Sequence, residues 1–246
     1  MIQRFLAALI LINPAAAQEI TVSAAISLQA ALEEIGPKFE KANPGARVVF
    51  NFGSSGALQQ QIQNGAPVDV FVSAAEKQMD ALQDRNLIFA DTRRVLLTNS
   101  LVLIAPAGTD IPRGLTGLGD PAIRHIAIGE PKSVPAGQYA LEALAAVGLD
   151  LKDRLVFAKD VRQVLTYVEG GNADAGFVYL SDINTRVPVR VVARIPSGSH
   201  APIVYPAAVV RTSANPALAR AFLDFLSGPA ARSVFVRAGF GNPESP

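Results

Sequence analysis

The sequence predicts an α/β fold in which mostly parallel sheets are covered by helices on both faces. Short β-type runs alternate with amphipathic helical patterns along most of the chain. The run Val68–Val72 is almost uninterruptedly apolar, as expected of a parallel strand buried on both faces. Half of the 246 residues are apolar and 17% are charged, a globular composition that fits one large domain or two smaller lobes.

The first half of the chain predicts three strand–helix units. The first helix opens at Ser27, and Pro37 within it predicts a kink or an early end. A short second helix ends at Gly65, and Ser73 with Glu76 predicts a capping box for the third. The predicted strands are Ile20–Ala24, Val48–Phe52 and Val68–Val72. The apolar faces of the three helices carry Leu28, Leu32, Ile35 and Phe39, then Leu58 and Ile62, then Met79 and Leu82.

The same alternation continues through the second half. A helix over Pro135–Val147 ends at Gly148, and Asp160 caps another that runs to about Glu169. Two amphipathic helices close the chain after Asn215 and after Gly228. The predicted strands are Leu101–Ala105, Ile126–Ile128, Leu155–Phe157, Ala175–Tyr179, Val189–Ile195 and Ile203–Val210. The Gly- and Pro-rich stretch Asp110–Pro121 is predicted to be a surface loop.

The first seventeen residues have the pattern of a secretory signal peptide. Arg4 precedes the apolar run Phe5–Ile12, and Ala15–Ala17 forms a small-residue cleavage site. The run is far shorter than the ~20 residues that span a bilayer. The chain has no cysteine to carry a lipid anchor. We therefore expect cleavage after Ala17 and an exported, soluble protein.

Charge and composition exclude several classes of function. The 22 basic and 21 acidic residues leave the chain nearly neutral, which argues against a nucleic-acid partner. Without cysteine there is no disulfide, no thiol nucleophile and no Cys-ligated metal. The only histidines, His125 and His200, leave little for metal chemistry or acid–base catalysis.

Small and hydroxyl residues gather where predicted strands pass into helices. Ligands of open α/β sheets bind at these carboxyl ends, where helix N-termini present unpaired N–H groups that suit anions. The junctions are Ala24–Ser27, Gly53–Gly56, Ser133–Gly137 and Lys159–Val161, and Tyr179 ends a strand. Taken singly, each feature also has a structural explanation, since Ser27 and Asp160 fit N-caps, Gly53–Gly56 fits a turn, and Tyr179 fits a core ring.

The segments at these junctions resemble the periplasmic molybdate-binding proteins of ABC uptake systems. The resemblance runs from about Glu19 to Phe240. Any one of its segments is weak evidence, but together and in this order they are specific. The segments are Ala24–Leu28, Phe52–Leu58, Gly65–Ala74, Asn99–Val102, Val134–Ala140, Asp160–Arg162, Gly176–Tyr179, Tyr205–Pro206 and Gly228–Ala231.

The resemblance implies a two-lobed type II periplasmic binding fold with one oxyanion in the cleft between the lobes. It places the first lobe at residues 18–97 plus 204–246 and the second at 98–203, with crossovers near Thr98 and Ile203. The implied ligand contacts are the hydroxyls of Ser27, Ser55 and Tyr179 and the backbone amides of Ala136 and Val161. No protein atom would bind the molybdenum directly.

The resemblance also implies the chain's partners. It implies a monomer that delivers its ligand to an ABC permease in the inner membrane, with no cofactor and no catalytic activity. Gly56 departs from the family, which often has Ser or Thr there, and leaves open whether a backbone N–H replaces one hydroxyl contact.

A site that contains only donors suits a fully ionised oxyanion. Molybdate accepts hydrogen bonds at every oxygen, whereas hydrogen phosphate carries a proton that needs an acceptor, and an unpaired buried donor costs about 1–3 kcal/mol. Sulfate differs from molybdate mainly in size, so the pocket radius must decide between them, and tungstate should bind like molybdate.

Other functions stay open at this point. They are binding of another ligand such as sulfate, thiosulfate or ferric ion, a periplasmic interaction module without a ligand, and a secreted hydrolase. The hydrolase lacks support, because Gly53–Gly56 has the wrong spacing for a nucleophile elbow.

Overall fold

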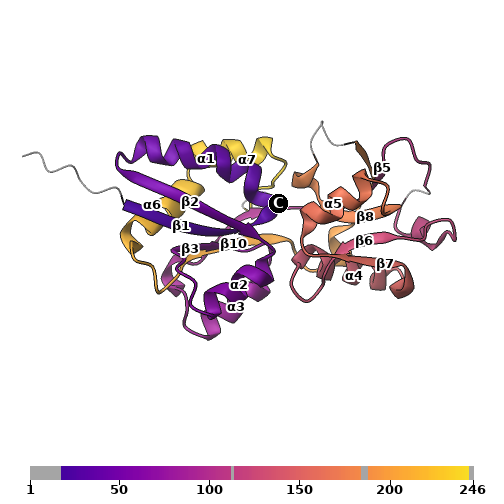
Figure 1. The fold of residues 1–246 in the computed structure, drawn as a ribbon, viewed down its shortest axis with the longest axis horizontal. Coiled ribbons are helices and arrows are strands. Elements are labelled where there is room, and N and C mark those ends of the chain that lie inside the picture. The colour runs from indigo at the N-terminus through magenta and orange to yellow at the C-terminus, as the bar shows by residue number, and fades with distance from the viewer. Residues whose placement is uncertain (1–17, 112–113, 184–187, 244–246) are drawn as a thin grey trace, which may run out of the picture.

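The computed structural model describes residues 18–111, 114–183 and 188–243, which form two lobes, each built on one five-stranded sheet (Figure 1). The predicted signal peptide, Met1–Ala17, lies outside these residues. The two-lobed α/β architecture predicted from the sequence is confirmed.

The first sheet has the strand order β2-β1-β3-β10-β4. β1 pairs in parallel with β2 and β3, whereas β10 runs antiparallel to both of its neighbours, so four of the five strands point the same way. Its strands are β1 (Gln18–Ala25), β2 (Ala46–Gly53), β3 (Val70–Val72), β4 (Arg94–Thr98) and β10 (Val204–Val209).

The second sheet repeats this plan with the order β7-β6-β8-β5-β9. β6 pairs in parallel with β7 and β8, and β5 is the one strand that runs antiparallel to its neighbours. Its strands are β5 (Leu101–Pro106), β6 (Ile126–Gly129), β7 (Leu155–Ala158), β8 (Ala175–Tyr179) and β9 (Val189–Arg194).

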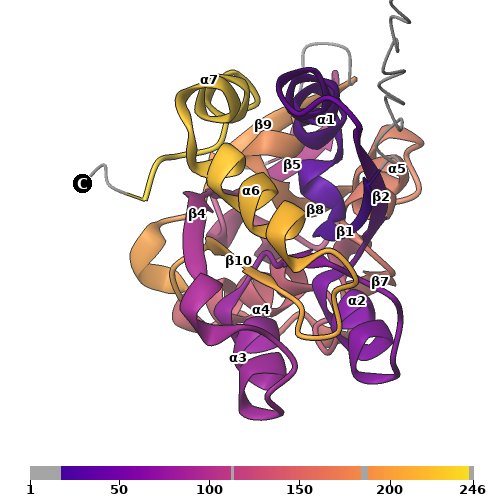
Figure 2. The ribbon, with the colours of Figure 1, turned by 90° about the vertical axis from the view of Figure 1, so that its left-hand side faces the viewer.

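Helices cover both faces of each sheet. Figure 2 shows α1, α6 and α7 on one side of the first sheet and α2 and α3 on the other. In the second lobe α4 and α5 lie on opposite sides of the sheet (Figure 1). The helices are α1 (Gln29–Ala42), α2 (Ser55–Gln63), α3 (Glu76–Asp84), α4 (Pro135–Ala146), α5 (Val161–Glu169), α6 (Pro216–Ser227) and α7 (Pro229–Arg237).

The chain passes between the sheets twice. One passage lies between β4 and β5, and the return lies between β9 and β10, so β10 completes the first sheet from far along the sequence. In the described part of the chain, no helix is both long and apolar enough to cross a membrane. The exact lobe limits expected from the sequence stay a prediction.

Two local predictions were wrong in whole or in part. Of the kink or early end predicted at Pro37, the early end is wrong, because α1 runs to Ala42 and Phe39 beyond the proline packs edge-on against Phe222 and Phe225 of α6. The kink stays a prediction. The capping box before α3 is absent. The Ser73 hydroxyl instead donates to the carbonyl of Ala75 (2.7 Å).

Strand β4 was not predicted at all. β4 lacks the regular alternation of buried and exposed residues, since Leu96 and Leu97 are both buried while Val95 is exposed. Pairing with β10 holds it in the sheet.

Candidate functional site

A small cavity lies between the lobes and is lined by residues of both. It sits at the carboxyl ends of strands, where open α/β sheets bind ligands. The lining residues are Ala25, Ile26, Ser27, Gly53, Ser54, Ser55 and Ala74 from the first lobe, and Val134, Pro135, Asp160, Val161 and Tyr179 from the second.

Three helix N-termini meet at this cavity. α2 begins at Ser55, α4 at Pro135 and α5 at Val161, and all three residues line it. The first backbone N–H groups of a helix have no partner within the helix and carry partial positive charge. Their convergence from two lobes makes a site that favours an anion.

Ser55 is held by a hydrogen bond from the backbone. The N–H of Ala74 donates to the Ser55 Oγ (2.9 Å), and the side chain is buried. Because the partner in this bond is a donor, the Ser55 hydroxyl hydrogen is not used in it and is available for donation toward the cavity. Ala74 itself was not singled out from the sequence, since no pattern identifies a backbone donor after a strand.

Ser27 lies in a short 3₁₀ turn, Ile26–Leu28, between β1 and α1. Its Oγ is 2.9 Å from the hydroxyl of Tyr205, which is fully buried in β10. Tyr205 was not predicted as a site residue, although it lies in one of the segments that carry the family resemblance.

The Tyr179 hydroxyl is buried and has no hydrogen-bond partner among the residues that the structure describes. It ends β8 and lines the cavity. Burial raises the pKa of this phenol well above its usual value, so the group keeps its proton and can act as a donor. A buried hydroxyl without a partner costs free energy, which a ligand oxygen at this position would recover.

The two predicted amide donors are placed differently. Val161 is the first residue of α5 and lines the cavity, and Asp160 caps that helix by accepting from the N–H of Gln163 (2.9 Å), as predicted. Ala136 is buried in the first turn of α4 but is not among the lining residues. Its neighbours Val134 and Pro135 line the cavity in its place.

Gly56 holds the lobes together instead of facing the cavity. Its N–H donates to the carbonyl of Ser133 in the other lobe (2.9 Å). A Cβ at this position would lie 2.7 Å from both the Cα and the carbonyl oxygen of Ser133. The missing side chain at Gly56 therefore permits this close approach of the two backbones.

Both histidines lie away from this cavity. His200 packs beside the ring of Tyr139, with its Nδ1 2.7 Å from the carbonyl of Ala201. The backbone of His125 bonds to Asp174. Within the described residues, no cluster of three or more His, Cys, Asp or Glu side chains could hold a metal ion.

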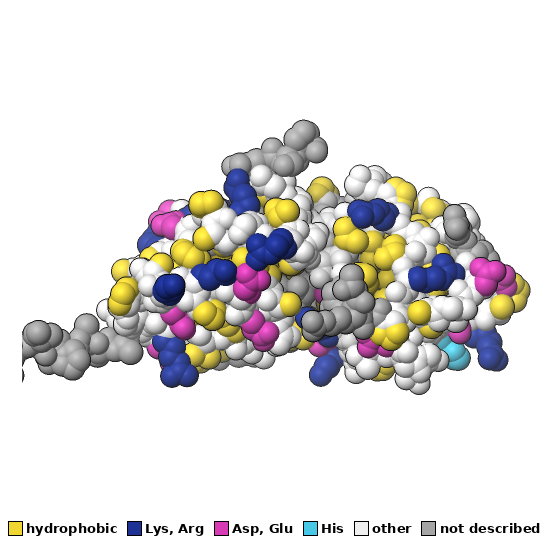
Figure 3. Space-filling model, turned by 90° about the horizontal axis from the view of Figure 1, so that it is seen from above, with side chains coloured by type: hydrophobic (Ala, Val, Ile, Leu, Met, Phe, Trp, Pro, Cys, Tyr) yellow, Lys and Arg dark blue, Asp and Glu magenta, His cyan; other side chains and the backbone are white. Residues whose placement is uncertain are grey.

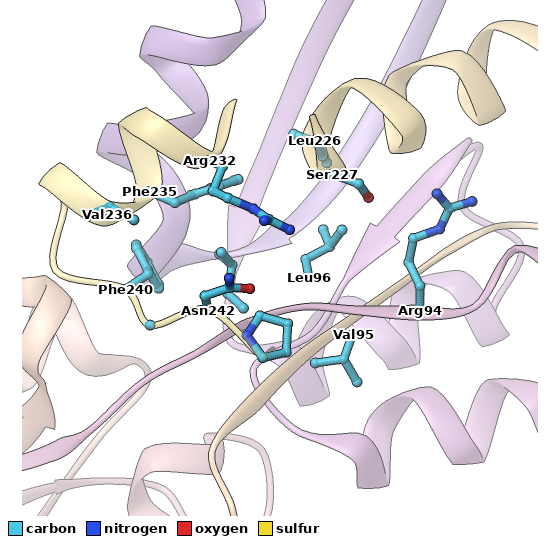
Figure 4. Close-up of a pocket in the computed structure, with 13 residues that line it drawn as sticks. Arg94, Val95, Leu96, Leu226, Ser227, Arg232, Phe235, Val236, Phe240 and Asn242 are labelled. Carbon is cyan, nitrogen blue, oxygen red and sulfur yellow. The ribbon is translucent and has the colours of Figure 1, made fainter. Parts of the chain in front are cut away.

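A larger cavity, of about 210 Å³, belongs to the first lobe alone. Leu96 of β4, Phe235 of α7 and Phe240 line it (Figure 4). Arg94 at its edge pairs with Asp224 (2.8 Å). None of the predicted site residues reaches it. On the face that Figure 3 shows, basic and acidic side chains are mixed over both lobes.

Comparison with known proteins gives consistent results. A family model described as bacterial extracellular solute-binding protein matches residues 20–241. The molybdate-binding protein ModA of Haemophilus influenzae is 43% identical over 92% of this chain and 91% of its own length. ModA of Escherichia coli is 42% identical over 90% and 88%. The structure of the periplasmic molybdate-binding protein of Azotobacter vinelandii aligns with a TM-score of 0.82 at 30% identity, covering 92% of this chain and all of that one.

Proposed function

The chain belongs to the family of bacterial extracellular solute-binding proteins, and we propose that it captures molybdate or tungstate between its lobes and delivers it to an ABC permease. The relatives that are 43% and 42% identical over about nine-tenths of the chain are named molybdate-binding proteins. The proposal includes export to the periplasm after removal of residues 1–17.

The unpartnered hydroxyl of Tyr179 is the observation that carries the proposal for the site. This hydroxyl lines a cavity to which both lobes contribute helix N-termini. In the same cavity the Ser55 Oγ accepts a hydrogen bond from the N–H of Ala74, and the Ser27 Oγ lies beside the hydroxyl of Tyr205. Such a cavity offers hydrogen atoms and few acceptors. An anion without a proton satisfies it, and hydrogen phosphate does not.

We assign the ligand contacts to the hydroxyls of Ser27, Ser55 and Tyr179 and to the N–H of Val161. The N–H of Ala136 stays in the proposal as a contact that requires a small shift of the α4 N-terminus. The ligand is held by aligned dipoles and charge-assisted hydrogen bonds, and no protein atom binds the metal. The protein needs no cofactor and acts as a monomer without catalytic activity.

Both lobes contribute donors to the ligand. The first lobe is taken as residues 18–97 with 204–246, and the second as residues 98–203. The donor set is complete only when the lobes are closed, so the ligand shifts the equilibrium toward the closed form. That form presents both lobes together to the permease.

Titration calorimetry of the chain from Gln18 to Pro246 tests the proposal. Molybdate and tungstate should each bind with one-to-one stoichiometry, and hydrogen phosphate should show no measurable binding at the same concentration. Binding of sulfate as tightly as molybdate would reassign the ligand to a smaller oxyanion. If none of the four anions binds measurably, the proposed site is contradicted.

A further inference from the structure

We propose that Tyr205 and Asn99 are positioning residues for the Ser27 hydroxyl, in which Tyr205 donates to the Ser27 Oγ so that the Ser27 hydrogen stays available for the bound anion. Neither residue lines the cavity. The inference rests on the proposed oxyanion function and adds the contacts that keep the Ser27 hydrogen available on one side of the site.

Asn99 is oriented without ambiguity. It lies in the passage from β4 to β5, and its Oδ1 accepts from the N–H of Ser100 (2.9 Å). Because a backbone N–H can only donate, the atom that faces it must be the oxygen of the amide. The Asn99 Nδ2 therefore points the other way, where it donates to Tyr205 Oη (3.1 Å) and to Ser181 Oγ (2.8 Å).

The bond from Asn99 determines what Tyr205 does with its own hydrogen. Tyr205 is fully buried, and its burial raises the pKa of the phenol, which keeps its proton. Its oxygen accepts from Asn99, so its hydrogen needs an acceptor. The Ser27 Oγ, 2.9 Å away, is that acceptor. The opposite direction would leave the phenol hydrogen buried and unpaired.

Ser27 is then in the same state as Ser55. In both residues a protein donor occupies the oxygen, Tyr205 for one and the N–H of Ala74 for the other. The remaining hydroxyl hydrogen of each is free for the ligand. If Tyr205 did not donate, the Ser27 hydrogen could turn away from the ligand, and both lone pairs of the Ser27 oxygen would be available to a protonated oxyanion.

The same chain of bonds joins both passages between the lobes. Asn99 lies in the first passage, Tyr205 follows the return passage, and Ser181 belongs to the second lobe just after β8. The orientation of Ser27 is thus linked to the placement of the lobes at their junction.

The first test is Tyr205→Phe, compared with wild type by titration with molybdate and by competition with hydrogen phosphate. Affinity for molybdate should fall about tenfold, since a charge-assisted bond is weakened. The ratio of phosphate to molybdate dissociation constants should shrink. Thr92→Val is the matched control, because it removes a buried hydroxyl bonded to the N–H of Val209 in the same strand. It should lower the Tm without changing either affinity.

The second test reverses the direction of the hydrogen bond between Tyr205 and Ser27. Asn99→Asp keeps the acceptor for Ser100 but cannot donate to Tyr205, whose hydrogen then turns to the new carboxylate. Ser27 must donate to Tyr205 and so presents a lone pair to the cavity. Molybdate affinity should fall more than in Tyr205→Phe. In the double variant Asn99→Asp/Tyr205→Phe the link is cut, and affinity should partly recover.

If Asn99→Asp weakened binding only through the negative charge of its carboxylate, the double variant would bind no better than Asn99→Asp. That result would overturn the inference. Unchanged affinity and selectivity in Tyr205→Phe would overturn it as well. Wild-type protein that binds no oxyanion would instead contradict the proposed function, so the two failures are distinguishable.

Discussion

The two sides of the interlobe cavity hold their donors in different ways. On the first lobe the hydroxyls of Ser27 and Ser55 already have protein partners. On the second lobe the Tyr179 hydroxyl has none among the described residues. The first side therefore has protein partners for its hydroxyl oxygens, whereas the second side contains a buried hydroxyl whose cost a ligand oxygen would offset. A ligand that reaches Tyr179 relieves this cost and thereby favours closure.

The largest expected effect is a pH dependence of stability that arises from Asp182, which follows β8 in the second lobe. Burial raises the pKa of Asp182 to about 7, Asp160 adds to this, and Arg162 and the N–H of Tyr179 oppose it. Between about pH 4 and pH 7 the folded state holds a proton that the unfolded state has released. The free energy of unfolding should thus fall by a few kcal/mol as the pH rises through this range.

Asp182→Asn should reduce the decrease in the free energy of unfolding between about pH 4 and pH 7, because the amide still accepts from the N–H of Tyr179 and does not titrate. Denaturant titrations at several pH values measure the difference. An equally steep fall in the variant would assign the dependence to other groups.

Ser55→Ala should weaken both stability and binding. The buried N–H of Ala74 would lose its partner, at a cost of about 1–3 kcal/mol in the free energy of unfolding, and the anion would lose one donor at a similar cost. Ser73→Ala is the control, since it also removes a buried hydroxyl next to Ala74 but not one that lines the cavity. Chemical denaturation and calorimetry should show a loss of stability in both variants and a loss of affinity only in Ser55→Ala.

Gly56→Ala should weaken binding while leaving each lobe folded. The added Cβ would collide with the backbone of Ser133, so closure should cost about 1–3 kcal/mol more. Gly198→Ala adds a methyl group where no atom lies within 4 Å and serves as the control. Unchanged molybdate affinity in Gly56→Ala would show that the lobes need not approach this closely.

Tyr179→Phe should have the smallest effect and should move stability and affinity in opposite directions. Affinity for molybdate should fall by about 1.5 kcal/mol, whereas the free energy of unfolding without ligand should rise by up to about 1 kcal/mol because an unpartnered hydroxyl is removed. Tyr167→Phe, at a partly buried ring of α5, should change neither. A less stable Tyr179→Phe protein would contradict the contrast between the two sides.

The sequence predicted the strand–helix order and the segments that meet at the cavity, because apolar periodicity and helix capping are local. Ser27, Ser55, Val161 and Tyr179 come together there. The role of Gly56 was not predictable, since its partner Ser133 lies in the other lobe. Tyr205 and the N–H of Ala74 were missed for the same reason, as both act through contacts that only the folded chain creates.

A crystal structure of the chain with molybdate bound tests the central claim most directly. The account predicts one anion between the lobes, with its oxygens accepting from the hydroxyls of Ser27, Ser55 and Tyr179 and from the N–H of Val161, and with no protein atom on the metal. An anion that contacts only one lobe, or a Tyr179 hydroxyl still without a partner in the complex, would contradict it.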